Sequence, residues 1–497
     1  MIDIRGSMSK RLNFTFTGIL YAIALVILAW QLGTALYLYI QNAAAVVQFP
    51  YPLEYGEGPV LDQVMRIARL ENIYRSDFAV PPYSVTNTPP LYMLLQTPFA
   101  WAVGPAFWYS RIISLISVLL AALFIGLTVH RLSGSVIAAL ISGALLLVFP
   151  FVLYWSVLDR ADTLALALSW AGLYTVVRWP DSRRGLTLAV TLFAAAVFTT
   201  QTYALVGPAT ALIWLLQNRQ ARQAAFLAGW LFAICLGLFM LLHLLTGGGF
   251  LLNVITASVN RGSHIGFMAN LTGLLIHAWI LVLGAAGFLV VERWWYPTRT
   301  WPLVLPYALL ATVSMLMFRT TGSSASPLYE PAAALCLAAG AVLAWPPPRS
   351  YLLKTIAVVL LAVQVNGLAN WSRNDYLPLV QNKVQDEAEI AQLAQIVREA
   401  PGPVLIDEYM GLAPLAGRPI YIQPYEFSQL QLAGLWSPDA LINAIQQREF
   451  PVILLYEPGT SPPKIVTRWT PEIRSTIWEN YHSVDTIGGV WIYVPNE

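Results

Sequence analysis

The chain has 497 residues, of which 57% are hydrophobic and 11% are charged, and its formal net charge is +2. Soluble domains carry roughly 25% charged residues, so this composition excludes a wholly soluble protein and predicts a polytopic membrane protein with a soluble part. The near-neutral charge gives no sign of a nucleic-acid partner. The two cysteines, Cys235 and Cys336, lie within apolar runs and do not form a disulfide framework.

Apolar runs of about 20 residues predict about eleven membrane-spanning helices. The first run follows a basic N-terminus and is too long for a cleaved signal peptide. Short connections that carry arginine or lysine alternate with connections that collect acids, which predicts a cytoplasmic N-terminus and an outer C-terminus. In chain order the predicted spans are 16–40, 107–129, 135–155, 161–178, 185–199, 203–218, 224–246, 271–292, 301–318, 328–346 and 351–370.

The first predicted outer loop, 41–106, contains Glu54 and Glu57 among glycines and prolines. From Val60 onward, apolar and charged side chains fall on opposite faces of a helix, which predicts an amphipathic helix at the membrane surface. Pro59 suits the start of that helix because proline lacks an N–H that the first turn cannot use. Glu57 lies just before this start, where a helix favours a carboxylate. It is therefore either a functional acid or a capping or solvated one.

The tail, 372–497, has a different composition from the apolar part, 1–371, and is predicted to be a separate extracytoplasmic domain. Strand-like segments such as "PVLIDE", "PVILLYE" and "GVWIYVP" alternate with helical patterns, which indicates a small α/β domain. The tail contains no glycine-rich phosphate-binding loop motif. We interpret it as a packing or recognition domain rather than a second catalytic site.

An acid after the first span, a surface helix and then "TNTPPLYMLL" resemble, in that order, the GT-C superfamily of membrane glycosyltransferases. The similar branch holds protein O-mannosyltransferases, lipid A aminoarabinose transferases and bacterial family-39-like enzymes. "WSVLDRADTLALAL" resembles the second acidic motif of this branch, and "SSASPLYEPAAALCLAAG" resembles its late loop-to-helix segment. The resemblance implies a polyprenyl-phosphate-linked sugar donor, a hydroxyl acceptor and inversion at the anomeric carbon.

The same resemblance implies roles for individual residues. By order and spacing, Glu57 matches the base that deprotonates the acceptor, Glu54 is the second candidate, and Asp162 would orient the acceptor or the base. Related enzymes often carry a lysine near the fifth and sixth spans, where this chain reads "FTTQTYA". The other outer cations are therefore candidates for the donor phosphate, and Arg160 is equally an ion-pair partner of its acidic neighbours. The phosphate candidates are Arg160, Arg261, His264 and Arg319, and the candidates on the acceptor side are Asp159, Tyr329 and Glu330.

The resemblance implies no required cofactor. The outer acids would nevertheless suit a divalent cation such as Mg²⁺, Mn²⁺ or Ca²⁺, with Glu57 and Asp162 as ligands. The implied partners are the lipid-linked donor, membrane lipid and a hydroxyl acceptor on a glycolipid, polysaccharide or protein. The implied location is the plasma membrane.

Two other functions remain open. A lipid-linked oligosaccharide polymerase or ligase would also work at the outer face, but with an oligosaccharide donor. A membrane transporter would show internal repeats and ionisable residues near the bilayer midplane. The chain shows no such repeat, and its predicted spans are nearly free of charge.

Overall fold

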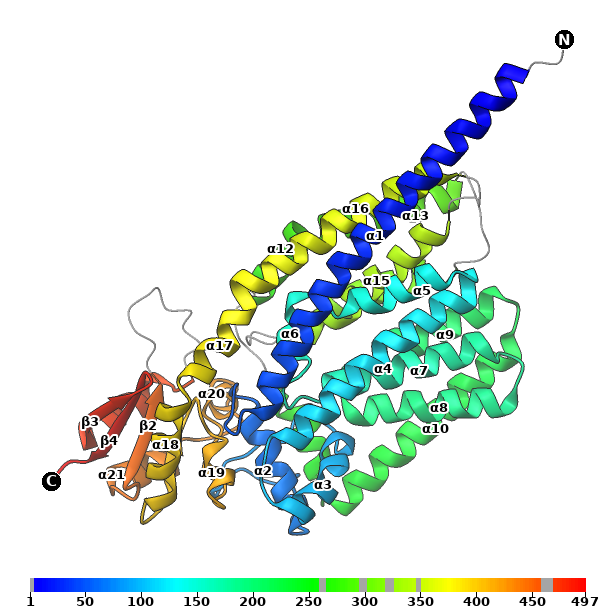
Figure 1. The fold of residues 1–497 in the computed structure, drawn as a ribbon. Helices are drawn as coiled ribbons and strands as arrows, with labels where there is room; N and C mark the ends of the chain where they lie inside the picture. Colours follow the sequence, from blue (N-terminus) through cyan, green and yellow to red (C-terminus); the bar gives the residue numbers. More distant parts are fainter. Residues whose placement is uncertain (1–3, 259–264, 295–301, 318–325, 346–349, 457–467) are drawn as a thin grey trace.

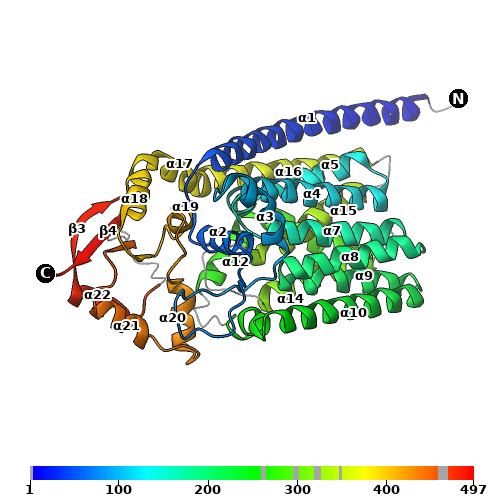
Figure 2. The ribbon, with the colours of Figure 1, turned by 90° about the horizontal axis from the view of Figure 1, so that it is seen from below.

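The computed structural model describes residues 4–258, 265–294, 302–317, 326–345, 350–456 and 468–497. A bundle of helices forms most of the molecule, and a small sheet with short helices lies at one end of it (Figure 1). The start of α1 and the end of β4 lie at opposite ends of the molecule in both views (Figures 1 and 2).

The bundle is made of the longer helices, most of which run side by side (Figure 2). They are α1 (Ile4–Gln48), α4 (Trp108–Ser133), α5 (Val136–Leu146), α7 (Asp162–Arg178), α8 (Arg183–Thr199), α9 (Val206–Gln217), α10 (Ala221–Leu245), α12 (Ile265–His277), α13 (Trp279–Trp294), α14 (Val304–Met317), α15 (Tyr329–Ala344) and α16 (Tyr351–Trp371). Shorter elements connect them: α2 (Glu57–Ala68), α3 (Leu91–Val103), α6 (Pro150–Trp155), η1 (Gln201–Ala204), α11 (Gly249–Leu251), η2 (Leu252–Thr256), η3 (Ser326–Leu328) and η4 (Ser372–Tyr376).

Each predicted span falls on one helix or on two consecutive elements. Among the described residues, four helical segments are long and apolar enough to cross a membrane: Phe16–Gln48, Trp108–Ser133, Ala221–Leu245 and Tyr351–Gln385. The other apolar helices of the bundle are shorter than the roughly 20 residues that a bilayer requires. The chain is therefore a multi-pass helical membrane protein, but the predicted count of eleven spans is not confirmed.

The predicted span 271–292 is two helices, because α12 and α13 meet at a break where their axes bend by 81°. Gln364 of α16 stabilises this corner: its Oε1 accepts the Ile280 N–H at 3.1 Å, and its Nε2 donates to the His277 carbonyl at 2.5 Å. The His277 ring also stacks on Trp371, with 4.3 Å between the ring centroids. One buried amide thus satisfies two backbone groups at the break.

Glycines allow α4 and α5 to pack with their backbones almost in contact. A Cβ added at Gly126 would lie 2.8 Å from the Ala139 carbonyl oxygen, and one added at Gly143 would lie 2.6 Å from the Ala122 carbonyl oxygen. Small residues commonly let membrane helices approach this closely. The contact fixes α4, which carries a residue of the candidate site in its first turn.

The C-terminal domain is built on a four-stranded mixed sheet of order β1-β2-β4-β3. Strands β1 and β2 pair in parallel with Val404 opposite Val452, whereas β4 pairs antiparallel with both β2 and β3. The domain contains α17 (Leu377–Gln385), α18 (Glu387–Glu399), β1 (Val404–Ile406), α19 (Leu412–Leu415), α20 (Pro424–Leu432), α21 (Asp439–Gln446), β2 (Val452–Tyr456), α22 (Pro471–Asn480), β3 (Tyr481–Ile487) and β4 (Val490–Pro495). Helices α16 and α17 are joined through η4, so the predicted boundary at residue 371 falls within one continuous helical segment, Tyr351–Gln385.

Helix α2 differs from the predicted surface helix because both of its faces are covered. Asp62 and Arg66, on the face expected to meet water, are 2% and 7% exposed. The Ile420 N–H of the C-terminal domain donates to Asp62 at 3.2 Å, and Arg66 donates to Ser84 at 2.8 Å. The C-terminal domain therefore packs on α2 instead of standing apart from the bundle (Figure 2).

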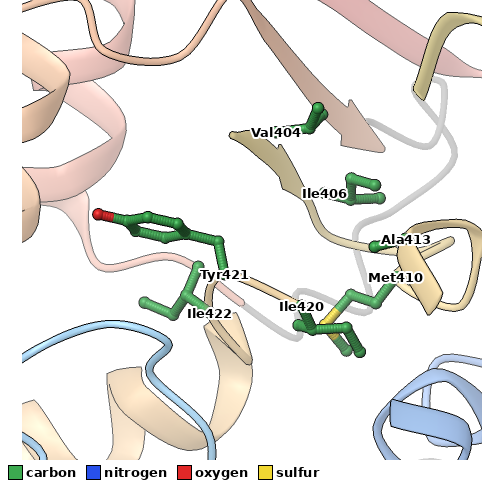
Figure 3. Close-up of a pocket in the computed structure, with 7 residues that line it drawn as sticks. All are labelled: Val404, Ile406, Met410, Ala413, Ile420, Tyr421 and Ile422. Carbon is green, nitrogen blue, oxygen red and sulfur yellow. The ribbon is translucent and has the colours of Figure 1, made fainter. Parts of the chain in front are cut away.

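A hollow in the C-terminal domain lies between β1 and the segment 420–422, and it does not locate the functional site (Figure 3). Its walls are almost wholly aliphatic and carry no charged side chain: Val404, Ile406, Met410, Ala413, Ile420, Tyr421 and Ile422. The ionisable side chains gather instead where α1, α2, α7 and the C-terminal domain meet.

Substituting Gly58 with alanine should loosen the packing of α2 on the C-terminal domain. A Cβ there would lie 2.5 Å from the backbone nitrogen of Gly411, which cannot move aside as a flexible side chain would. We expect G58A to lower the free energy of unfolding by about 1–3 kcal/mol and to expose the domain to limited proteolysis. Gly367→Ala is the matched control, because its Cβ would meet nothing within 4 Å. Equal thermal stability of both variants would contradict this docking contact.

Candidate active site

A buried ion pair joins the start of α2 to the start of α4. The side chains of Glu57 and Arg111 are both 0% exposed. Arg111 Nε donates to Glu57 Oε1 at 2.9 Å, and one terminal nitrogen donates to Oε2 at 2.8 Å. This two-pronged geometry is the strong form of an arginine–carboxylate contact.

Arg111 also binds the end of α1 and the turn that follows it. Its guanidinium donates to the carbonyl oxygens of Val46 at 2.8 Å, Phe49 at 2.5 Å and Tyr51 at 2.8 Å. The last carbonyls of a helix have no partner within the helix and attract a cation. Arg111 therefore fixes the direction in which the chain leaves α1 and enters the loop that carries Glu54.

Glu57 holds two loops together through the oxygens that face Arg111. Its Oε2 accepts the Leu53 N–H at 2.7 Å, and its Oε1 accepts the Asp159 N–H at 2.9 Å. Leu53 precedes Glu54, and Asp159 precedes Arg160. The spacing between the two acidic loops is thus set by one carboxylate.

These contacts argue against Glu57 as the base that the resemblance implied. Burial alone would raise the pKa of Glu57, but Arg111 and the two backbone donors hold it below its ordinary value. A carboxylate with a low pKa, four hydrogen bonds and no exposed surface accepts a proton poorly and cannot touch an acceptor. We therefore treat Glu57 as a positioning residue.

Glu54, the second candidate, keeps part of its side chain exposed. Its Oε2 accepts the Gly56 N–H at 2.8 Å and lies 3.3 Å from an Arg160 terminal nitrogen. Arg160 Nε lies 3.4 Å from Asp162 Oδ2, so the arginine lies between the two acids. The side chains of Glu54, Arg160 and Asp162 are 14%, 21% and 14% exposed. We call these three residues the acidic triad.

The surroundings of Glu54 suit proton transfer better than those of Glu57. Burial raises the pKa of Glu54, and Arg160 offsets only part of that increase, so its pKa lies above the ordinary value. A base whose pKa moves toward neutral pH accepts a proton more readily. The Arg160 guanidinium also stacks over the Trp155 ring at 5.1 Å, which holds it in place beside Glu54.

Asp159 is close to the acidic triad but is not part of it. Its side chain is 0% exposed, and Oδ1 accepts a hydrogen bond from Gln96 at 3.1 Å. Burial and the nearby Glu57 carboxylate raise its pKa to about 7. Asp159 is therefore shielded from solvent, and its side chain does not pair with Arg160.

The C-terminal domain contributes charged residues that sequence reasoning missed. Lys383 donates to the Leu53 carbonyl at 2.8 Å and to Glu408 at 2.9 Å, and Arg468 also pairs with Glu408. The Arg468 guanidinium lies 4.7 Å from the centroid of the Tyr55 ring. The sequence offered one signal for this group: Asp407 and Glu408 directly follow a predicted strand in "LIDEY". Nothing in the sequence placed them beside the first outer loop.

The remaining candidates fall into two groups. Tyr329 and Glu330 are buried in the bundle at 2% and 6% exposure, rather than lying at the mouth of a loop. Arg261, His264 and Arg319 lie outside the described residues.

Glu57 and Asp162 do not fit a shared metal ion. The Glu57 oxygens are occupied by Arg111 and two backbone N–H groups, and Asp162 faces Arg160. Among the side chains that the structure describes, no three acidic, histidine or cysteine residues gather as metal ligands would.

Removing Arg111 should destabilise the protein far more than removing an exposed arginine. Arg111→Met leaves a buried carboxylate without its cation, which typically costs about 3–5 kcal/mol. Arg69→Met, which breaks the exposed pair with Glu71, should cost about 0–1 kcal/mol. Thermal unfolding of both variants in one detergent tests this difference. Similar melting temperatures would show that the buried pair does not hold the loops.

Asp159 should make stability depend on pH near neutrality. Its ordinary pKa is 3.8 and its folded pKa is about 7, so the stability it contributes is full below 3.8 and is lost as the pH rises through about 7. Asp159→Asn should remove that part of the decline, so the variant gains stability relative to the unsubstituted chain at about pH 8. Melting temperatures measured from pH 5 to about pH 8 provide the test. A stability difference between the two chains that does not change with pH would contradict the assignment.

No family model matches the chain, and no curated protein matches it. Several solved structures do. ArnT from Cupriavidus metallidurans, bound to undecaprenyl phosphate, is 15% identical with a TM-score of 0.62, and the match covers 94% of this chain and 97% of that chain. The archaeal oligosaccharyltransferase AglB from Archaeoglobus fulgidus, in complex with an inhibitory peptide and a dolichol-phosphate, is 13% identical with a TM-score of 0.52, covering 84% of this chain and 69% of that chain.

The arabinofuranosyltransferase AftD from Mycobacteria is 15% identical with a TM-score of 0.51, and the match covers 97% of this chain and 40% of that chain. All three structures are members of the GT-C superfamily. Identities of this size carry a likeness of fold, and the ArnT match extends over nearly the whole of both chains. The chain therefore has the GT-C fold that its loop motifs resemble.

Proposed function

We propose that this chain is an inverting glycosyltransferase that moves a sugar from a polyprenyl-phosphate donor to a hydroxyl acceptor. The shared fold and the undecaprenyl phosphate bound to ArnT support a lipid-linked donor. The observation that carries the proposal is the acidic triad, a partly exposed carboxylate–arginine–carboxylate arrangement in a many-helix membrane protein.

Glu54 acts as the general base in this proposal. It is partly exposed, its pKa is raised, and its second oxygen, Oε1, is not engaged by either Gly56 or Arg160. Asp162, on the other side of Arg160, orients Glu54 through the shared arginine. Glu57 keeps both loops in register and does not touch the substrates.

The reaction balances without further reactants. As the acceptor oxygen forms its bond to the anomeric carbon, its proton passes to Glu54. The bond between the anomeric carbon and the phosphate oxygen breaks, and the lipid phosphate leaves with the electron pair. A positioned base contributes about 10²–10⁴-fold to such a step.

The phosphate needs a cation as it gains charge. Arg160 is the candidate that the described residues support, because it lies within the acidic triad and is 21% exposed. Arg261, His264 and Arg319 remain alternative proposals for the same role.

We place the acidic triad on the extracytoplasmic side, with the N-terminus in the cytoplasm. The proposal is supported by the position of the C-terminal domain, which lies at the end of the bundle opposite to the start of α1 (Figure 1). The likeness to AglB keeps a second function open, in which the donor carries an oligosaccharide instead of a single sugar.

Glu54→Gln should reduce sugar transfer by about 10²–10⁴-fold while leaving the melting temperature unchanged, because it removes the base but not the buried pair. Glu57→Gln should instead lower the melting temperature. Glu71→Gln, at an exposed acid, is the control that should retain full activity. The assay follows transfer from undecaprenyl-phosphate-linked monosaccharides and oligosaccharides in proteoliposomes. Near-normal turnover by Glu54→Gln would refute its role as the base.

A further inference from the structure

Four ionisable side chains lie buried together inside the bundle, next to the acidic triad. They come from three elements: Tyr203 from η1, Tyr307 from α14, and Tyr329 and Glu330 from α15. Their exposed fractions are 4%, 0%, 2% and 6% in that order. We call them the tyrosine–glutamate cluster.

Most of the hydrogen-bonding capacity of this cluster is unused. The Tyr307 hydroxyl donates to Glu330 Oε2, and the Tyr307 ring packs on Trp170 with 4.7 Å between the centroids. Glu330 Oε1 and the hydroxyls of Tyr203 and Tyr329 have no hydrogen-bond partner within the described part of the chain. One acceptor and two hydroxyls are therefore left unsatisfied in one place.

The cluster adjoins the acidic triad from the bundle side. The Tyr203 hydroxyl interacts electrostatically with Glu330, Asp162 and Tyr329. The Tyr329 hydroxyl interacts in turn with Asp162 and Arg160. Asp162 is thus shared between the exposed triad and the buried cluster.

Helix capping does not explain Glu330. It is the second residue of α15, where the helix dipole favours an acid. The N-cap of α15 has no side-chain hydrogen bond, however, and Glu330 Oε1 accepts none from the residues that the structure describes. A buried polar group left without a partner is destabilising, and ionisable groups inside membrane proteins commonly have a function.

We propose that the tyrosine–glutamate cluster binds the sugar ring of the donor, an inference that rests on the proposed function. A neutral sugar presents adjacent hydroxyls, each of which can donate to Glu330 Oε1 and accept from Tyr203 or Tyr329. The surrounding aromatic rings provide apolar faces for the C–H side of the sugar. The donor phosphate does not belong here, because Glu330 would repel it.

The elements that carry the cluster favour the donor sugar over the acceptor. Its four residues come from η1, α14 and α15, and Tyr307 packs on Trp170 of α7, so the cluster belongs to the helical bundle. Glu54 instead lies beside Arg160 and interacts with Glu408 of the C-terminal domain. The lipid that carries the donor sugar lies in the membrane, on the side of the bundle.

The test measures binding of two probes to the purified full-length protein in nanodiscs: undecaprenyl phosphate alone, and the same lipid phosphate carrying glucose, mannose or arabinose. The unsubstituted protein should bind at least one sugar-bearing probe more tightly than the bare phosphate. Glu330→Gln and Tyr203→Phe should each lower the affinity for that sugar-bearing probe by about tenfold or more. Each should change the affinity for the bare phosphate by less than about twofold. Tyr74→Phe, which removes the hydroxyl of a buried tyrosine outside the cluster, should change neither.

Failure of this inference differs from failure of the proposed function. If the unsubstituted protein binds neither probe, the proposed function fails and takes the subsite with it. If the protein binds both probes, two results would overturn the subsite. One is an equal affinity for the bare and the sugar-bearing lipid phosphate. The other is that both variants keep the preference for the sugar-bearing probe. Tyr203→Phe removes a hydroxyl that has no partner among the described residues, so it should fold even if Glu330→Gln does not.

Discussion

The architecture of the candidate site depends on the buried ion pair between Glu57 and Arg111. Burying two charges costs several kcal/mol per ion unless every remaining lone pair and proton is satisfied. The protein meets this requirement with backbone groups: three carbonyls from the end of α1 and its turn, and two N–H groups from the loops that carry Glu54 and Arg160. All hydrogen bonds of the pair can form only when both loops adopt one arrangement. Any other arrangement would leave a buried charge without partners, so the pair fixes the geometry of the site.

This constraint gives different roles to chemically similar acids that are close in sequence. Glu54 and Glu57 are three residues apart, yet Glu57 is fully buried and ion-paired while Glu54 keeps exposed surface and a raised pKa. Asp159 and Asp162 also differ in their surroundings, since Asp159 is fully buried and only Asp162 reaches Arg160. In each loop one acid is fully buried and the other keeps part of its side chain exposed. The chemistry of a carboxylate is thus decided by its surroundings and not by its motif.

The sequence predicted what is local and missed what depends on distant contacts. Hydropathy located the helices, and the order of acidic motifs indicated the GT-C fold that the solved structures share. It could not show that Arg111, 54 residues away, would bury Glu57, because nothing local marks that pairing. It also could not show that the C-terminal domain would cover the polar face of α2, or that Gln364 would stabilise a break in a predicted span.

The buried pair and the tyrosine–glutamate cluster represent opposite solutions to the same physical problem. Both place carboxylates in surroundings of low dielectric, where an unpaired polar group is costly. Around Glu57 every oxygen is satisfied by the protein, which leaves a rigid support and nothing for a ligand to bind. Around Glu330 the described residues leave one oxygen and two tyrosine hydroxyls unsatisfied, so a ligand that supplies hydroxyls gains hydrogen bonds without displacing any that the structure shows. Asp162 lies between the two regions. The rigid support around Glu57 and Arg111 therefore also holds the tyrosine–glutamate cluster in position for the sugar.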